Sequence, residues 1–197
     1  MTDDLRAAAP ARPLRADARR SIDRIVTAAH ALVEEQGPAV SLDEVAKRAG
    51  VAPATLYRHF PNRMHLFETV YRSRMLTVLD RAPELSAAHG PMDALLHWLR
   101  EFIDFSVESH RVLTVLLSQG LHESDPNANA REGRAQVVPV VARLLLPAQQ
   151  AGGIRADLTA EELVALVIGM TFASDYHESR ADVHRTMELL IDGLAPR

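Results

Sequence analysis

The fold of this chain is decided by residues Ser41 to Tyr71, which read SLDEVAKRAGVAPATLYRHFPNRMHLFETVY. Ser41 is followed three residues later by Glu44, the spacing of a capping box in which each side chain accepts a hydrogen bond from the other residue's backbone N–H. A helix is therefore predicted to begin near Leu42. Its apolar face continues at helical spacing until Gly50, and glycine ends helices because it adopts the left-handed conformation without a Cβ clash.

A second short helix is predicted directly after this turn. Pro53 suits the first position of a helix, where its missing N–H costs nothing, and Pro61 stops the helix after Phe60. Two short helices joined by a turn of about three to four residues that contains glycine form a helix-turn-helix. The second helix, over residues 53–59, is then the recognition helix.

The two sides of this second helix differ when it is drawn as a wheel at about 100° per residue. Leu56, Phe60 and Pro53 lie on the inner side, which is predicted to pack against the domain. The outer side and its flanks are predicted to be free, and they carry Ala54, Thr55, Arg58, Tyr57 and His59. An arginine can bond bidentately to guanine in the major groove of DNA, and alanine or the threonine methyl can contact a thymine methyl. The pattern therefore indicates a helix that binds duplex DNA, with the flanking Tyr57 and His59 placed for phosphates.

The run AGVAPATLYRHFPNR, followed by Leu66-Phe67, resembles the TetR-like one-component transcriptional regulators, and the resemblance covers roughly Ser21 to Tyr71. It implies that the operator is contacted by the residues at matching positions, namely Ser41, Thr55, Tyr57, His59 and Arg63. It also implies that sequence is read at variable positions, here Pro53, Ala54 and Arg58. Two residues depart from the family's pattern, because Ala52 stands where a serine cap is usual and Arg63 replaces a common lysine. The missing cap is expected to weaken the helix by about 0.5–2 kcal/mol, offset in part by the preset φ of Pro53.

Each of these DNA contacts has a structural alternative. Tyr57 and His59 are amphipathic side chains that could simply support the domain. Arg58 and Arg63 could be solvated surface charges, and Ser41 could be a helix cap alone.

Charge is distributed unevenly along the 197 residues, whose net charge is −4. Residues 1–75 carry 12 Lys and Arg against 9 Asp and Glu, whereas residues 76–197 carry 10 against 17. The predicted DNA-binding part is therefore the basic part. Residues 1–17 are rich in Pro and Ala and have too few large apolar side chains to fold alone, so a flexible basic arm is predicted. Such an arm follows the DNA backbone, enters a minor groove, or adds only general electrostatic attraction.

An all-α fold is predicted, with a three-helix DNA-binding domain over residues 18–71 and a helical ligand-binding and dimerisation domain over residues 72–197. The first domain opens with a scaffold helix from about Asp17 to Gly37, and a fourth helix runs from after Asn62 to about Arg81. In the second domain, a polar loop or crossing is expected over residues 123–129. Helices are predicted after Pro91 and over an apolar segment at 112–121. A longer helix is predicted over about 130–151, with a kink or break at Pro139 and at Pro147. The last two helices are predicted after a second capping box at Thr159 and Glu162, and over 183–194.

Two properties of residues 72–197 are implied by the resemblance. The last two helices would pair with their copies in a second subunit, and a two-fold homodimer supplies the two half-sites that helix-turn-helix proteins need; ordinary intrachain core is the alternative. The middle helices would hold a small-molecule effector, with simple core packing as the alternative for each candidate. The candidate pocket residues are His97, Trp98, Phe102, Phe105, His122, Met170, Phe172, Asp175 and Tyr176.

The resemblance thus implies a repressor that binds a palindromic double-stranded DNA operator as a homodimer and is released by a small-molecule inducer. The chain has no cysteine, which excludes disulfides, thiolate metal sites and thiol redox sensing. It has no apolar run near 18 residues and no signal-peptide pattern, so a cytoplasmic protein without membrane contact is expected, associated with the nucleoid when DNA-bound.

Three other functions compete with a ligand-responsive DNA-binding regulator. An enzyme could use the acid and base groups of residues 175–178, but there is no Gly-rich phosphate loop, nucleophile elbow or HExxH pattern, so no catalytic residue and no cofactor is predicted. A metal sensor is disfavoured because no two histidines lie at i, i+4 with a matching carboxylate set; the closest group is Asp175, His177, Glu178 and His184. A TetR-like head that serves only protein interaction remains as the third.

Overall fold

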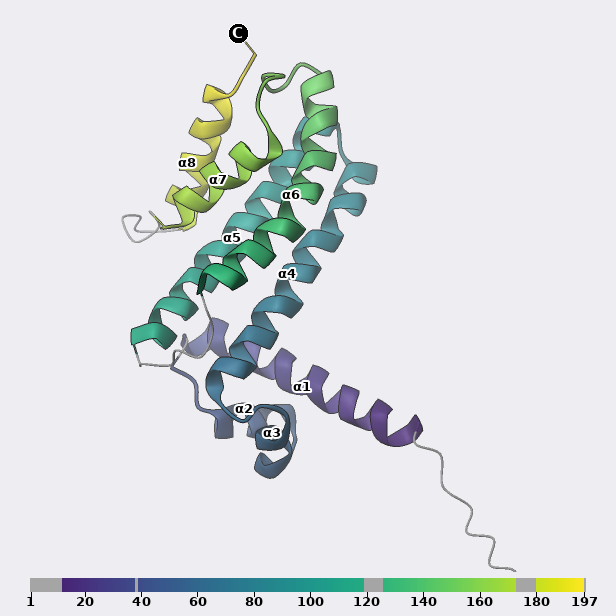
Figure 1. The fold of residues 1–197 in the computed structure, drawn as a ribbon, viewed down its shortest axis with the longest axis vertical. Helices are drawn as coiled ribbons and strands as arrows, with labels where there is room; N and C mark the ends of the chain where they lie inside the picture. The colour runs from purple at the N-terminus through teal and green to yellow at the C-terminus, as the bar shows by residue number, and fades with distance from the viewer. Residues whose placement is uncertain (1–11, 38, 119–125, 173–179, 197) are drawn as a thin grey trace, which may run out of the picture. The chain divides into compact units, whose positions relative to one another are not determined.

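The computed structural model describes residues 12–37, 39–118, 126–172 and 180–196 (Figure 1). All regular secondary structure in these ranges is helical, as predicted. The helices are α1 (Arg12–Gln36), α2 (Leu42–Ala49), α3 (Pro53–His59), α4 (Arg63–Ala88), α5 (Pro91–Ser118), α6 (Pro126–Gln150), α7 (Ala160–Phe172) and α8 (Arg180–Gly193). None of the described helices is long and apolar enough to cross a membrane. The chain divides into two compact units, residues 1–70 and 71–197, and the division falls inside α4.

Unit 1 contains α1, α2, α3 and the first part of α4. Its core is one cluster of buried apolar side chains, which includes Ile25, Leu32, Val45, Leu56 and Leu66. The scaffold helix α1 begins at Arg12, earlier than the predicted start near Asp17, because alanine, leucine and arginine favour a helix and a proline is tolerated in its first turn. The end of the predicted arm is therefore helical, and residues 1–11 lie outside the described residues.

The helix-turn-helix forms as its local signals predict. The Ser41 hydroxyl accepts a hydrogen bond from the Glu44 N–H at 3.1 Å, and Glu44 Oε2 accepts one from the Ser41 N–H at 3.0 Å, which confirms the capping box. Gly50 ends α2 with a φ of 64°, and the N–H of Val51 donates to the Ala46 carbonyl at 3.0 Å. This is the glycine-terminated helix end that satisfies the last carbonyls of α2.

Unit 2 is a helical bundle built from the rest of α4 and from α5, α6, α7 and α8 (Figure 1). Its core is centred on α5, where Leu95, Trp98, Leu99 and Ile103 are almost wholly buried. The second capping box is also confirmed, since the Thr159 hydroxyl accepts from the Glu162 N–H at 3.2 Å while Glu162 Oε2 accepts from the Thr159 N–H at 2.8 Å. The helices α4, α5 and α6, which precede this capping box, differ from the prediction in their boundaries.

Three helix boundaries of unit 2 were predicted wrongly. The helix α4 continues beyond Arg81 to Ala88, although Pro83 lies inside it. The apolar segment predicted separately at residues 112–121 continues α5 as far as Ser118. Finally, α6 begins at Pro126, inside the predicted loop at 123–129, whose first three residues lie outside the described residues.

The two internal prolines of α6 do not break it. Pro139 and Pro147 both lie within the helix and are exposed. The opposite side of α6 buries Val137, Val140, Val141, Leu144, Leu145 and Ala148 in the core. An internal proline costs about 3 kcal/mol or more, but burying several aliphatic side chains at about 1.5–3 kcal/mol each stabilises the helix by more than that.

Replacing Gly50 with alanine is expected to destabilise the protein by about 1–2 kcal/mol, because a Cβ is disfavoured in the left-handed conformation. The space around Gly50 is open, so the effect would come from the backbone alone. Urea unfolding of the whole chain measures it. Gly193→Ala is the matched control, since this helical glycine has no positive φ and its added Cβ would meet nothing within 4 Å. Equal stability changes in the two variants would refute the role of Gly50.

The capping box should also make stability depend on pH. Hydrogen bonds from the Ser41 backbone N–H, and secondly from its hydroxyl, lower the pKa of Glu44 below its ordinary value of 4.5. A carboxyl whose pKa is lower in the folded state contributes stability that is complete above its unfolded pKa and is lost as the pH falls through the folded pKa. The stability advantage of the wild type over Glu44→Gln should therefore shrink below about pH 4.5. An advantage that stays constant in urea unfolding between about pH 7 and pH 3 would contradict this.

Candidate DNA-binding interface

The orientation of α3 is set by two buried side chains. Leu56 is 0% exposed and Phe60, directly after the helix, is 3% exposed, and both pack in the core of unit 1. This confirms the predicted inner side at these two positions. Pro53 was assigned to the same side but is exposed, because it occupies the first position of the helix, beyond the edge of the core.

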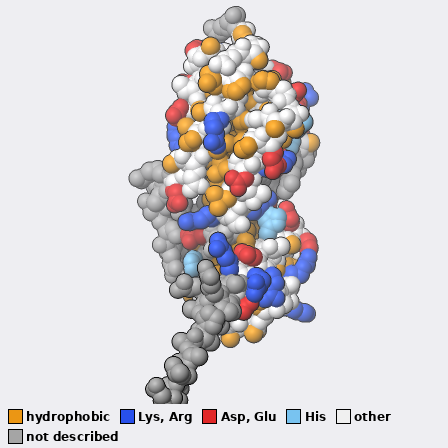
Figure 2. Space-filling view, turned by 90° about the vertical axis from the view of Figure 1, so that its right-hand side faces the viewer, with side chains coloured by type: hydrophobic (Ala, Val, Ile, Leu, Met, Phe, Trp, Pro, Cys, Tyr) orange, Lys and Arg blue, Asp and Glu red, His pale blue; other side chains and the backbone are white. Residues whose placement is uncertain are grey.

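The opposite side of α3 is free, as predicted. Pro53, Ala54 and Arg58 are exposed, Tyr57 is 46% exposed and Thr55 is half-buried. Within the described part of the chain, the Arg58 guanidinium makes no hydrogen bond or ion pair. On the face shown in Figure 2, Lys and Arg side chains gather over the lower part of the surface, which unit 1 forms.

Tyr57 is tied to the first turn of α2. Its hydroxyl donates a hydrogen bond to Asp43 Oδ1 at 3.4 Å, the outer limit for such a bond. Because Tyr57 is half exposed, a phosphate oxygen could replace Asp43 as the acceptor. Asp43 could not be predicted from the sequence, because a contact between residues fourteen apart depends on how the two helices pack and leaves no local signal.

Ser41 has its hydroxyl occupied. Besides accepting from Glu44, the hydroxyl donates its single hydrogen to Glu44 Oε2 at 3.0 Å. A phosphate contact by this hydroxyl would require it to give up that bond beside a carboxylate. The cap is thus confirmed, whereas the DNA contact of Ser41 stays a prediction.

His59 and Arg63 are half-buried rather than solvated. The Nε2 atom of His59 is buried and has no hydrogen-bond partner among the described residues, so a phosphate contact would have to use Nδ1. Arg63, the first residue of α4, has its guanidinium carbon 5.5 Å from the centroid of the Phe67 ring. Partial burial lowers the pKa of Arg63, but arginine stays charged at neutral pH. His59 is the last residue of α3 and Arg63 is the first residue of α4, so both lie next to the exposed side of α3 in sequence.

A second arginine near the helix-turn-helix is already paired. Arg48 donates two hydrogen bonds to the carboxylate of Glu35, at 2.9 Å and 2.5 Å, which links α2 to the end of α1. The local sequence gives no signal for this pair either, since it joins two helices. Because Glu35 neutralises it, Arg48 adds less than Arg58 to the positive charge of this surface.

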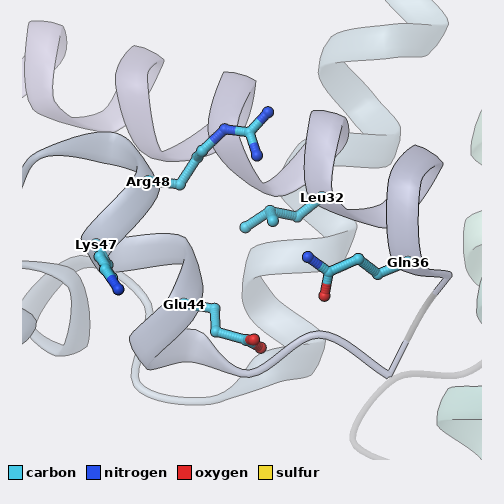
Figure 3. A pocket seen from close by; sticks show the side chains of 5 residues that line it. All are labelled: Leu32, Gln36, Glu44, Lys47 and Arg48. Carbon is cyan, nitrogen blue, oxygen red and sulfur yellow. The ribbon is translucent and has the colours of Figure 1, made fainter.

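A hollow of about 450 Å³ lies between α1 and α2 (Figure 3). Its lining residues are Leu32, Gln36, Glu44, Lys47 and Arg48. Leu32 is buried and supplies the apolar part, whereas the carboxylate of Glu44 and the guanidinium of Arg48 are held by Ser41 and Glu35. The hollow belongs to unit 1, so it is separate from the effector pocket predicted in unit 2.

The aromatic residues predicted to line that pocket fill the core of unit 2. Trp98 is 0% exposed, stacks on Phe102 with ring centroids 5.2 Å apart, and donates its indole N–H to the Val78 carbonyl at 2.9 Å. Phe105 is buried and lies 5.1 Å from the Tyr71 ring. These contacts match the alternative of simple core packing.

His97 differs from these buried aromatic residues. Its side chain is exposed, its Nδ1 lies 2.7 Å from the carbonyl oxygen of Asp93 in its own helix, and its ring stacks on His89 at 4.5 Å. A ligand contact by His97 therefore stays a prediction. Met170 is partly buried against the core. Of the other candidates, His122, Asp175 and Tyr176 lie outside the described residues, as does the side chain of Phe172.

The histidine considered for a metal group has a different partner. His184 Nε2 lies 2.9 Å from Asp104 Oδ1, which joins α8 to α5. Asp175, His177 and Glu178 lie outside the described residues. His184 therefore has a structural contact of its own.

Comparison with known proteins identifies both parts of the chain. Residues 25–70 match the family of bacterial regulatory proteins named tetR, and residues 90–196 match the C-terminal domain of SbtR-like transcriptional regulators. The chain is 23% identical over 171 residues to the HTH-type transcriptional regulator UidR of Escherichia coli K12, covering 81% of this chain and 82% of UidR.

Solved structures with the same fold include two that are more than 30% identical to this chain. A TetR transcriptional regulator from Streptomyces coelicolor is 31% identical, with a TM-score of 0.72, covering 89% of this chain and 98% of that one. A TetR transcription regulatory protein from Mycobacterium vanbaalenii is 32% identical, with a TM-score of 0.68, covering 93% of this chain and 99% of that one. The exposed recognition helix, the two family matches and these relatives agree: the chain belongs to the TetR family and is a helix-turn-helix transcriptional regulator, not an enzyme.

Proposed function

We propose that this regulator is a repressor that binds a palindromic DNA operator as a homodimer and is released by a small-molecule inducer. The observation that carries the DNA part is the side of α3 opposite Leu56 and Phe60, which is exposed and presents an unpaired guanidinium. A bound repressor of this kind blocks polymerase access, and it would be found with the nucleoid.

The proposed contacts divide by chemistry. Side chains on the exposed side of α3 meet base edges, and these are Pro53, Ala54, Thr55 and Arg58. Side chains around it meet phosphates, and these are Tyr57, His59, Arg63 and, after release from Glu44, Ser41. Phosphate contacts give affinity for any duplex, whereas base contacts give preference for one sequence.

The homodimer is supported by leucines that unit 2 leaves exposed. Leu166 on α7 is 40% exposed and Leu189 on α8 is 61% exposed. Pairing these two helices with their copies would bury both side chains. A two-fold dimer also provides two recognition helices for two half-sites.

The inducer is proposed by analogy with the family. Binding of an inducer and of the operator would be linked, so each would weaken the other's affinity by the same factor. Because Trp98 and Phe102 are packed against each other, a pocket in unit 2 would have to use other side chains or separate these two.

In vitro selection from random duplex DNA should enrich a palindrome, and binding to it should weaken steeply with salt. Arg63→Ala should weaken binding to all sequences about equally and reduce the log–log salt slope by about one, because one phosphate contact is lost. Arg63→Lys should restore most of the affinity, since it keeps the charge. Arg143→Ala, which removes an exposed arginine of α6, is the control and should change neither quantity.

A stably folded Arg63→Ala protein with unchanged affinity and salt slope would refute this phosphate contact. Weak binding without a consensus sequence would instead favour a head that serves only protein interaction.

Leu166→Asp and Leu189→Asp should each convert the dimer to monomers, because a carboxylate would be buried in the interface without a partner. Sedimentation equilibrium measures the change. Leu146→Asp is the matched control, since this leucine of α6 is 56% exposed but lies outside the last two helices. Dimers that persist in the first two variants, or dissociation in all three, would contradict the proposed interface.

A further inference from the structure

We infer, on the basis of the proposed DNA-binding function, that each half-site contains a guanine read by Arg58. We further infer a thymine, read by Ala54, within about two base pairs of that guanine. The inference concerns the base sequence of the operator, and it depends on the orientation of α3 and on which of its side chains are occupied.

The orientation of α3 places Ala54 and Arg58 together. Leu56 and Phe60 are four residues apart and both are buried, so they fix the side of α3 that faces the core. Ala54 and Arg58 are also four residues apart and both are exposed. Residues four apart lie on one face of a helix. A groove surface that meets one of these side chains therefore meets the other.

Arg58 is the side chain on this face that can present two parallel N–H donors to one base. Within the described residues its guanidinium has no partner, whereas the hydroxyl of Tyr57 donates to Asp43 and Arg48 is bound by Glu35. Guanine presents two acceptors, N7 and O6, in the major groove, and the arginine fork matches them. Adenine places a donor beside its N7, and the pyrimidines offer no such acceptor pair. Guanine is therefore the base that Arg58 selects.

Ala54 can contribute only an apolar contact. Its methyl group is exposed and carries no donor or acceptor, so in the major groove it selects the C5-methyl group of thymine. Four residues of helix advance by about 6 Å, and successive base pairs are about 3.4 Å apart. The thymine is therefore expected within about two base pairs of the guanine.

The two predicted base contacts are tested by atom-level substitutions in the operator that in vitro selection yields. Replacing guanines one at a time by 7-deazaguanine, which lacks the N7 acceptor, should weaken wild-type binding about 5- to 100-fold at one position in each half-site. Arg58→Ala should bind the natural operator with a similar loss and should be insensitive to 7-deazaguanine at that position. Arg58→Lys keeps the charge but lacks the two parallel donors, so it should lose most of the sensitivity to 7-deazaguanine. Arg143→Ala is the control and should remain as sensitive to 7-deazaguanine as the wild type.

Replacing thymine by uracil, which lacks the methyl group, should weaken wild-type binding roughly three- to fourfold at one position near that guanine. Ala54→Gly should be insensitive to this change, with circular dichroism confirming that the variant is folded.

The outcomes separate this inference from the function on which it rests. Specific binding that no 7-deazaguanine affects, or equal sensitivity in wild type and Arg58→Ala, would overturn the role of Arg58. Specific binding that is indifferent to uracil would overturn the role of Ala54. In these cases the protein would remain a sequence-specific regulator. Absence of sequence-specific binding to any duplex would overturn both the inference and the proposed function.

Discussion

The burial of Leu56 and Phe60 is the contact on which the DNA-binding surface depends. The recognition helix α3 spans only Pro53–His59, too short to be stable in isolation, and no side chain caps its N-terminus. Helix propensity therefore cannot hold it in place. Two side chains four residues apart, both within the core of unit 1, determine which side of α3 faces inward. The orientation that they set determines which residues of α3 are exposed on the opposite side.

Contacts from α2 then refine the surface that α3 presents. The capping box and the left-handed Gly50 fix both ends of α2, so that the turn delivers Pro53 to the start of α3. Carboxylates occupy some of the groups that could otherwise bind DNA, since Glu44 accepts the hydrogen of Ser41 and Glu35 neutralises Arg48. Arg58 is left without such a partner among the described residues.

Local signals in the sequence were enough to predict the helix-turn-helix, whereas features that depend on packing were not. The spacings Ser41–Glu44 and Thr159–Glu162 each predicted a helix start, because a capping box is made within four residues. Pro139 and Pro147 do not break α6, because the buried face of the helix outweighs the cost of a proline. Trp98 was ambiguous, since an aromatic residue at helical spacing suits a pocket wall and a core equally well. Partners such as Asp43 came from helices that meet only after folding.

The burial of Leu56 and Phe60 also limits how the proposed inducer would control DNA binding. Turning α3 within unit 1 would expose Leu56 and Phe60, at a cost of roughly 1.5–3 kcal/mol for each side chain. The coupling free energy between two sites in a protein is typically about 1–3 kcal/mol, which falls short of the roughly 3–6 kcal/mol that both side chains require. An effector that acts within this range would leave α3 in place. It would act instead through α4, which supplies Leu66 and Val70 to the core of unit 1 and Met75 and Leu85 to the core of unit 2, and so belongs to both.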